Sequence, residues 1–304
     1  MRKILPLLFV GLLAVCAATA EDSPASRHDA VKQLADDARQ GDAKALYYLA
    51  TFHDKGYDTI LVDSLRSTAL YRLSAEKGYS PAMNYLGFRY FTGEAVRKDI
   101  DSAIFWIRKA ADMGDITAAA NLGYLLADSP EITHDIDEAA KWLTIASEAG
   151  VKEAQIRLGE IKEDEWRMLP PDSALNLGLK FYSGNAHILG VKLLEKDANH
   201  NNAKALALLG DAYSKGRGLP YDYQKSIEYF YRAAILGDPS AQFIIAELID
   251  FFPDAIPLLD DSFINQSELS SPQYWYEKAA SKGIVDSKTA YDSLFSPINR
   301  QITH

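Results

Sequence analysis

The chain of 304 residues contains a single cysteine, Cys16, at the end of an apolar N-terminal stretch. The rest of the chain has no thiol, which excludes a disulfide framework and a nucleophilic cysteine there. It also lacks a run of basic residues, which argues against binding to nucleic acid or to an anionic membrane surface. No later apolar stretch is long enough to cross a bilayer, so we expect a soluble or peripheral protein.

Motifs that carry chemistry are missing as well. The six histidines are isolated, and neither His-Glu-x-x-His nor Gly-x-Ser-x-Gly occurs. Gly216-Arg217-Gly218 has the composition of a phosphate-binding turn, but its place in the pattern described below favours a loop between two helices. The sequence therefore predicts no metal, no cofactor and no catalytic residue.

The first twenty residues have the pattern of a secretory signal peptide. Arg2 and Lys3 precede an apolar run, and Ala18-Thr19-Ala20 has the small residues of a cleavage site. We expect cleavage after Ala20 and a periplasmic or secreted protein. Removal of the two basic residues leaves 42 acidic and 30 basic side chains, a net charge of −12. The alternative is a bacterial lipoprotein that carries a lipid anchor on Cys16.

The dominant feature of the sequence is a repeat of 36 residues. Glycine recurs at this interval in two series, which are Gly78, Gly114 and Gly150, and Gly87, Gly123 and Gly159. Eight positions before the end of each unit lies an aromatic residue, at Trp106, Trp142, Tyr229 and Trp275. Fifteen positions before it lies an aspartate, at Asp63, Asp99, Asp135 and Asp222. Such alignment of several residue types indicates a repeat architecture.

Each unit has the punctuation of two helices. In the clearest copy, Pro81 starts a first helix that Gly93 ends, and Asp99 caps a second helix that Gly114 ends. Gly87 lies inside the first helix, where glycine costs about 1 kcal/mol relative to alanine. Its recurrence at one phase indicates that two backbones approach there too closely for a Cβ.

The aromatic residue of each unit shares a helical face with small residues four and three positions before the unit ends. We interpret these aromatic residues as core residues, although exposed tryptophans would also suit a sugar-binding platform. The interpretation covers Trp106, Trp142 and Trp275.

The sequence predicts an all-α fold, an α/α superhelical solenoid of about seven helix-turn-helix repeats. The expected parts are a signal peptide over residues 1–20, a leader and N-terminal capping helix over 21–41, the solenoid over 42–284, and a C-terminal capping helix and tail over 285–304. Two irregularities are expected. Over residues 160–201, the short run Glu165-Trp166-Arg167 replaces a normal second helix, and residues 252–272 form an insertion.

The consensus A-x-x-x-L-G-x-x-Y-x-x-G, followed by D-x-x-x-A-x-x-W-x-x-x-A-A-x-x-G, resembles the Sel-one-like repeat (SLR) family, relatives of the tetratricopeptide repeats. The match is clearest over residues 82–114, 118–150 and 205–237. This resemblance implies a right-handed superhelix whose first helices line a concave surface. It also implies an adaptor or scaffold for protein complexes, with secreted bacterial members acting in the cell envelope. It transfers no catalytic residue.

We interpret the protein as an exported, non-catalytic scaffold for protein–protein interaction in the bacterial cell envelope. Variable side chains on the concave face of the first helices would bind the partner. The candidates are Tyr48, Asn84, Tyr85, Arg89, Asn121 and Arg157. The alternative for these residues is an ordinary solvated face. A protein that binds envelope polysaccharide or peptidoglycan is a second interpretation, and a hydrolase with an unrecognised pair of carboxylates is a third.

Overall fold

The structure, a computed structural model, describes residues 24–132, 135–252, 271–286 and 289. Within these ranges fifteen helices form, no strand forms, and none of the helices is long and apolar enough to cross a membrane. The signal peptide predicted over 1–20, with Cys16, lies outside the described residues. So do most of the insertion predicted over 252–272 and most of the capping helix and tail predicted over 285–304.

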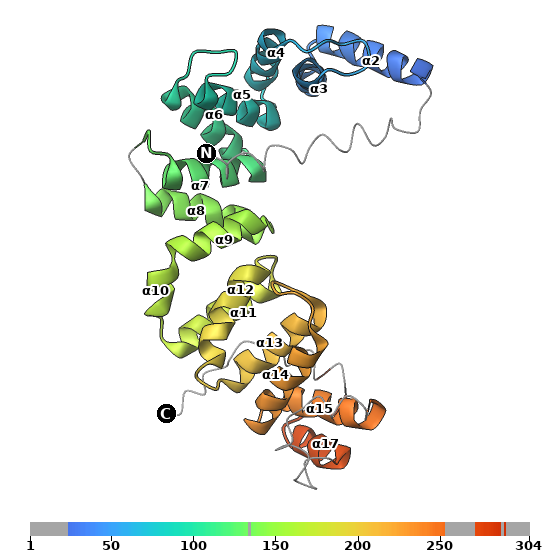
Figure 1. Ribbon diagram of the computed structural model, residues 1–304, viewed down its shortest axis with the longest axis vertical. Coiled ribbons are helices and arrows are strands. Elements are labelled where there is room, and N and C mark those ends of the chain that lie inside the picture. The colour runs from blue at the N-terminus through green and yellow to red at the C-terminus, as the bar shows by residue number, and fades with distance from the viewer. Residues whose placement is uncertain (1–23, 133–134, 253–270, 287–288, 290–304) are drawn as a thin grey trace. The chain divides into compact units, whose positions relative to one another are not determined.

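The chain divides into two compact units, residues 1–146 and 147–304. The first unit holds α2 (Pro24–Arg39), α3 (Ala43–Lys55), α4 (Ser64–Glu76), α5 (Ser80–Thr92), α6 (Ile100–Asp112), α7 (Ile116–Asp128) and most of α8 (Ile136–Glu148). The second holds α9 (Lys152–Ile161), α10 (Glu163–Arg167), α11 (Pro171–Ser183), α12 (His187–Ala198), α13 (Ala203–Lys215), α14 (Tyr223–Ile235), α15 (Pro239–Phe251) and α17 (Pro272–Ala280). Figure 1 shows successive helices packed as pairs within each unit, which confirms the predicted all-α repeat fold.

At three junctions between consecutive helix pairs, a Gly-Asp dipeptide ends one helix and caps the next. Gly114 has a φ of +87°, a left-handed conformation that glycine adopts without strain. The Asp115 N–H donates to the Ala110 carbonyl at 3.1 Å, as expected of a Schellman motif. The Asp115 carboxylate then accepts a hydrogen bond from the Ala118 N–H at 2.9 Å and caps α7. Gly41-Asp42 and Gly237-Asp238 repeat this arrangement.

The four recurrent aspartates cap the second helices, as their spacing predicts. Each carboxylate accepts a hydrogen bond from the backbone N–H three residues later, at 2.9 Å for Asp63, 3.3 Å for Asp99, 2.9 Å for Asp135 and 3.0 Å for Asp222. These bonds satisfy N–H groups that have no partner inside the helix.

The first-helix glycines form the closest contact within each pair. A Cβ on Gly87 would lie 2.5 Å from Cγ1 of Ile107 and 2.9 Å from the Ala103 carbonyl oxygen. Gly123 faces Leu143 of its second helix in the same way, at 2.6 Å. The predicted close approach at the glycines is thus confirmed for these repeats.

The first-helix glycine leaves a small gap, called the glycine notch here. The side chain that fills it belongs to the residue one position after the tryptophan of the second helix. Ile107 is 5% exposed, whereas Trp106 is only half-buried and has the Lys109 ammonium 5.3 Å from its ring centroid. Trp142 is half-buried too, while Trp275 is 2% exposed. The interpretation as core residues is therefore correct for Trp275 and wrong for the other two. A shift of one residue turns a helix by about 100°, which is enough to move a side chain from the buried face of the second helix to its more exposed face.

The irregular repeat near Trp166 is completed by a helix from further along the chain. α10 is only five residues long, in agreement with the short run predicted there. Gly159 of α9 faces Leu189 of α12, whose side chain would lie 3.3 Å from an added Cβ. The Lys196 ammonium, also on α12, donates at 2.9 Å to three backbone carbonyls at the C-terminal end of α10 and just beyond it, which belong to Trp166, Arg167 and Leu169. α12 therefore covers α9 and ties down the end of α10.

α12 also carries a buried carboxylate. Asp197 is fully buried, and neither of its oxygens has a hydrogen-bond partner within the described part of the chain. It occupies the position that other units fill with a small residue, such as Ala110 or Ala233. Burial raises the pKa of Asp197 to about 6, while Lys196 and His200 oppose the shift and Asp172 adds to it.

We expect Gly87→Ala to destabilise the protein although alanine favours helix. The added Cβ meets the Ala103 carbonyl and Ile107, and such overpacking costs about 1–3 kcal/mol, against a gain in helix propensity of about 1 kcal/mol. Gly159→Ala is the matched control, because its Cβ meets only side-chain atoms at 3.3 Å or more. Urea unfolding followed by circular dichroism should show a loss for Gly87→Ala alone. An equal change in stability in both variants would contradict the claim that close helix packing requires glycine at position 87.

We expect Asp197→Asn to stabilise the protein at neutral pH and to have little effect at pH 4. The folded pKa of about 6 lies above the ordinary value of 3.8, so the carboxylate disfavours folding increasingly as pH rises between these values. The gain at pH 7.5 should be on the order of 2 kcal/mol. Urea midpoints at both pH values measure it, with the exposed Asp164→Asn as control. A gain that is the same at both pH values would contradict this account.

Candidate functional site

The six predicted partner-binding residues do not share one environment. Tyr48 lies on α3, Asn84, Tyr85 and Arg89 lie on α5, Asn121 lies on α7, and Arg157 lies on α9. The two tyrosines and Arg157 are half-buried, whereas both asparagines and Arg89 are buried. The structure brings Tyr48 and Tyr85 into one cluster, and it ties Asn84 to Asn121.

The two asparagines link neighbouring first helices. The Asn121 side-chain amide donates to the Asn84 side-chain oxygen at 3.1 Å, and each residue is 4% exposed. A buried hydrogen bond of this kind satisfies groups that would otherwise be costly to bury. This pair therefore holds α7 against α5, and little of either side chain reaches the surface.

Arg89 forms an internal ion pair. Its guanidinium is 1% exposed and contacts the carboxylates of Asp54, at the end of α3, and Glu94, in the loop after α5. The Ser67 hydroxyl of α4 also donates to Asp54, at 3.1 Å. Removal of one partner of a buried pair leaves an uncompensated charge and is strongly destabilising. A change at Arg89 would therefore act on the fold before it acted on a partner.

Arg157 belongs to α9 of the second unit. Its guanidinium pairs with Glu160 one helical turn later, at 2.9 Å, and its side chain is 25% exposed. Of the predicted arginines it is therefore the one that a partner could reach.

Tyr48 and Tyr85 belong to a cluster of five tyrosines from three helices and a helix start. Tyr47 lies at the centre, with ring centroids 5.4 Å from Tyr48, 5.6 Å from Tyr71, 5.2 Å from Tyr79 and 6.1 Å from Tyr85. Tyr71 stacks on Tyr85 at 4.7 Å and is fully buried beneath the others. The four half-buried members, Tyr47, Tyr48, Tyr79 and Tyr85, are called the tyrosine surface here.

Three tyrosines of the tyrosine surface have phenols that hold their protons more firmly than usual. Burial is the main cause that raises the pKa of Tyr47, Tyr79 and Tyr85 above 10, and the neighbouring phenols and carboxylates add to the shift for Tyr47 and Tyr79. These phenols therefore stay protonated near neutral pH and cannot serve as bases. Each offers an apolar ring and a hydroxyl that donates or accepts hydrogen bonds.

The sequence missed two members of this surface, Tyr47 and Tyr79. Tyr47 occupies in α3 the position that Asn84 occupies in α5, so the repeat register could have indicated it. Tyr79 lies just before α5, at the junction position where Asp42, Asp115 and Asp238 cap other first helices. The repeat pattern has no recurrent aromatic residue at the position of Tyr79, so it could not have predicted this member.

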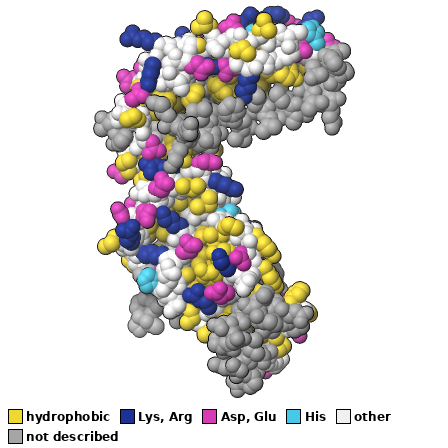
Figure 2. Space-filling view, viewed as in Figure 1, with side chains coloured by type: hydrophobic (Ala, Val, Ile, Leu, Met, Phe, Trp, Pro, Cys, Tyr) yellow, Lys and Arg dark blue, Asp and Glu magenta, His cyan; other side chains and the backbone are white. Residues whose placement is uncertain are grey.

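The described residues include no group of three or more His, Cys, Asp or Glu side chains placed to hold a metal ion. The histidine rings contact nearby groups instead, with His187 Nδ1 2.9 Å from the Tyr182 carbonyl oxygen and His200 Nδ1 2.8 Å from the Lys196 carbonyl oxygen. Gly216 ends α13 in a left-handed conformation, so the Gly-Arg-Gly segment is the predicted loop between two helices. On the face drawn in Figure 2, acidic and basic side chains are interspersed.

The Sel1 repeat family model matches residues 43–79, 80–115, 116–151, 203–238 and 273–284, more than half of the chain. These matches cover three consecutive repeats of the first unit and the helix pair of α13 and α14 in the second. A search of curated protein sequences found no match.

Similar solved structures are repeat proteins of bacteria. A protective antigen of uropathogenic Escherichia coli with an SLR fold is 25% identical, with 87% of this chain and 58% of that chain covered and a TM-score of 0.41. This chain thus spans less than two thirds of that antigen. A Sel1 repeat protein from Oxalobacter formigenes is 23% identical, with 80% and 89% covered and a TM-score of 0.40. A putative Sel1 repeat protein from Klebsiella pneumoniae is 17% identical, with 69% and 95% covered and a TM-score of 0.33.

TM-scores this low contribute nothing further to the interpretation, which depends on the family match. Sel1 repeat proteins are generally helical scaffolds for protein interaction without catalytic activity. The match over more than half of the sequence shows that this chain belongs to the Sel1 repeat family.

Proposed function

We propose that this protein is an exported, non-catalytic scaffold that binds a protein partner in the bacterial cell envelope. The observation that carries the proposal is the tyrosine surface on the first helices α3 and α5, which gathers four half-buried aromatic rings in one place. Its position on first helices agrees with a binding face on that side of the repeats.

Tyrosine is suited to this role for physical reasons. It buries a large ring with little loss of side-chain entropy and keeps a hydroxyl for hydrogen bonds, so it is enriched at the centres of protein interfaces. The ring contacts of Tyr47 with its four neighbours hold the cluster in place before a partner arrives. A preformed surface loses less entropy on binding.

The proposed location depends on the N-terminal sequence. The basic residues, apolar run and small cleavage residues of segment 1–20 are the features that direct a chain out of the cytoplasm. The lack of cysteine after Cys16 suits an oxidising compartment, because no thiol is left to form a wrong disulfide. A lipid anchor on Cys16 is the alternative form of the same export.

A second candidate, binding to envelope polysaccharide or peptidoglycan, is favoured by one observation on α6. Phe105 is 57% exposed and its ring contacts the half-buried Trp106 at 5.2 Å, edge to face. Two adjacent aromatic residues on an outer face could stack on sugar rings. A pull-down on purified sacculi, compared between the native protein and Trp106→Ala, tests this candidate.

The protein purified from its native host should begin at Glu21. Cleavage after Ala20 fixes this N-terminus, and intact-mass measurement on the envelope fraction reads it directly. A chain that begins at a lipid-modified Cys16 would support the anchored form instead. A chain that keeps residues 1–20 and stays in the cytoplasmic fraction would contradict export.

A photo-crosslinking residue in place of Tyr48 should capture a protein partner in the native host, because Tyr48 is a half-buried member of the tyrosine surface. The same residue in place of Tyr221, which is 66% exposed on a loop of the other unit, is the matched control. Mass spectrometry identifies the captured protein. In addition, Tyr48→Ala should reduce recovery of this partner at least tenfold while the helical circular dichroism stays unchanged.

Two outcomes would overturn the protein-binding proposal. One is equal capture at positions 48 and 221, which would indicate random collisions. The other is retention of the protein on sacculi without any captured protein, which would favour the polysaccharide candidate.

A further inference from the structure

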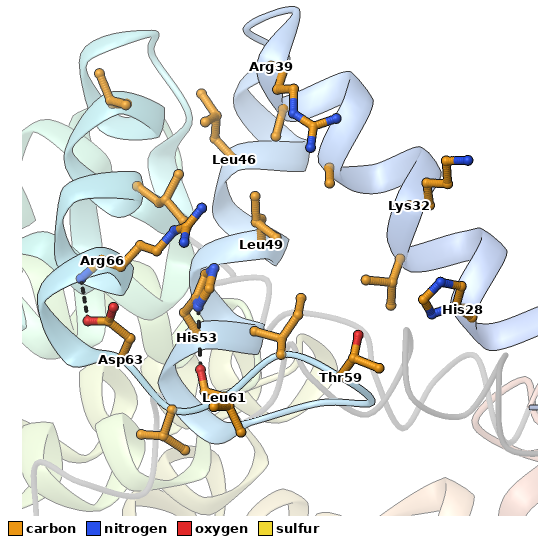
Figure 3. A pocket seen from close by; sticks show the side chains of 17 residues that line it. His28, Lys32, Arg39, Leu46, Leu49, His53, Thr59, Leu61, Asp63 and Arg66 are labelled. Carbon is orange, nitrogen blue, oxygen red and sulfur yellow. Dashed lines mark hydrogen bonds between the residues drawn. The ribbon is translucent and has the colours of Figure 1, made fainter.

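A second surface lies at the N-terminal end of the first unit, apart from the tyrosine surface. It is a groove of about 940 Å³ with α3 as its floor and with α2, α4 and the loop over residues 59–63 as its walls. Figure 3 shows side chains from all four segments directed into this space. It is called the N-terminal groove below.

The floor of the N-terminal groove is apolar. Leu46 and Leu49 of α3 form a small buried cluster with Ala38 of α2, and Val31 of α2 is 8% exposed beside them. The rim continues this apolar surface into solvent. Leu61 is 82% exposed, Val62 63% and Leu73 48%. Contiguous exposed apolar groups of this kind mark interaction sites.

The loop that presents Leu61 and Val62 is held in place by its own contacts. The Asp63 N–H donates to the His53 carbonyl at 2.7 Å, and His53 Nδ1 lies 3.4 Å from the Leu61 carbonyl oxygen, as the dashed line in Figure 3 shows. Tyr57 stacks on Phe52 of α3 at 4.4 Å and pairs with Ile60 through two backbone hydrogen bonds. The leucine is therefore held outward by a fixed backbone.

The charges around the N-terminal groove are mainly positive. Lys32, Arg39 and Arg66 line it, against one carboxylate, Asp63. The Asp63 carboxylate already caps α4, and Arg39 already pairs with Asp36. Within the part of the chain that the structure describes, no ion pair or hydrogen bond engages the Lys32 ammonium or the Arg66 guanidinium, and both side chains are exposed on opposite walls (Figure 3).

This positive rim is unusual for the protein, because the whole chain has a net charge of −10. An apolar floor between two unpaired cations is complementary to a segment with apolar residues on one side and carboxylates on its flanks. Helical walls on two sides favour an amphipathic helix, which places its apolar face in such a groove with anchors at i, i+3, i+4 and i+7.

We propose that the N-terminal groove binds an acidic amphipathic helix of a protein partner. Leucine-type anchors of this helix contact Leu46, Leu49 and Leu61, and its carboxylates pair with Lys32 and Arg66. The site goes beyond the proposed function, since it involves neither the tyrosine surface nor the export of the chain.

Two synthetic helical peptides of 18 residues test the proposal. They share leucines at i, i+3, i+4 and i+7, and their polar positions carry glutamate in one peptide and lysine in the other. Binding to the chain that begins at Glu21 is measured by fluorescence anisotropy at two salt concentrations. The acidic peptide should bind at least tenfold more tightly than the basic one, and its affinity should fall as salt screens the rim charges.

Variants of the rim test its charged residues and its apolar residue separately. Lys32→Glu with Arg66→Glu should weaken binding of the acidic peptide at least tenfold, whereas Lys109→Glu with Lys141→Glu, two exposed lysines elsewhere in the same unit, should leave it unchanged. Leu61→Gln should weaken it through the apolar contact. Circular dichroism and urea midpoints confirm that each variant is folded.

Three results would overturn the proposal. These are equal binding of both peptides, binding that the rim charge reversal does not change, and a rim reversal that alters only self-association in sedimentation, which would assign the groove to a second copy of the chain. The Tyr48 crosslink is independent of these measurements, so failure of either proposal is distinguishable from failure of the other.

Discussion

The close approach of paired helices at the first-helix glycine is the constraint on which the repeat depends. Hydrogen in place of a methyl group lets Ile107 fill the notch at Gly87, and Leu143 does the same at Gly123. The Ala103 backbone then lies so near that a side chain on the glycine would separate the pair. When the glycine contact holds the two helices together, the side chains at outward positions can differ between repeats. Those side chains form the surfaces available to partners.

The two surfaces use that freedom in different ways. The tyrosine surface is built from aromatic rings, so we expect a partner to bind it mainly through apolar contact and hydrogen bonds. The N-terminal groove combines an apolar floor with Lys32 and Arg66, so its electrostatic part is sensitive to salt. Both lie in the first unit, where three consecutive repeats match the family. A scaffold with two such surfaces could hold two partners on one short array.

The repeat, the helix caps and the short α10 could be predicted because they depend on residues at fixed intervals along the chain. The misplacement of Trp106 shows the limit of that reasoning, since its neighbour Ile107 fits the same interval to within one position. Arg89 shows a second limit. Its partner Asp54 is 35 residues earlier, so the sequence alone suggested an exposed arginine where the structure has a buried ion pair. The N-terminal groove could not be predicted from the sequence either, because its floor and walls come from three helices and a loop that share no repeated motif.

The junction between repeats has a consequence for how such a chain can change in length. Gly114-Asp115 ends one helix and caps the next within two residues, so an inserted residue there would break both motifs and shift every later repeat against its neighbour. The loop between the two helices of one repeat does not have to end one helix and cap the next within two residues. Residues 253–270, the largest departure from the period, fall between α15 and α17, inside a repeat. Such an array can therefore gain whole repeats, or residues in the loop inside a repeat. Both changes keep the register of every helix pair intact.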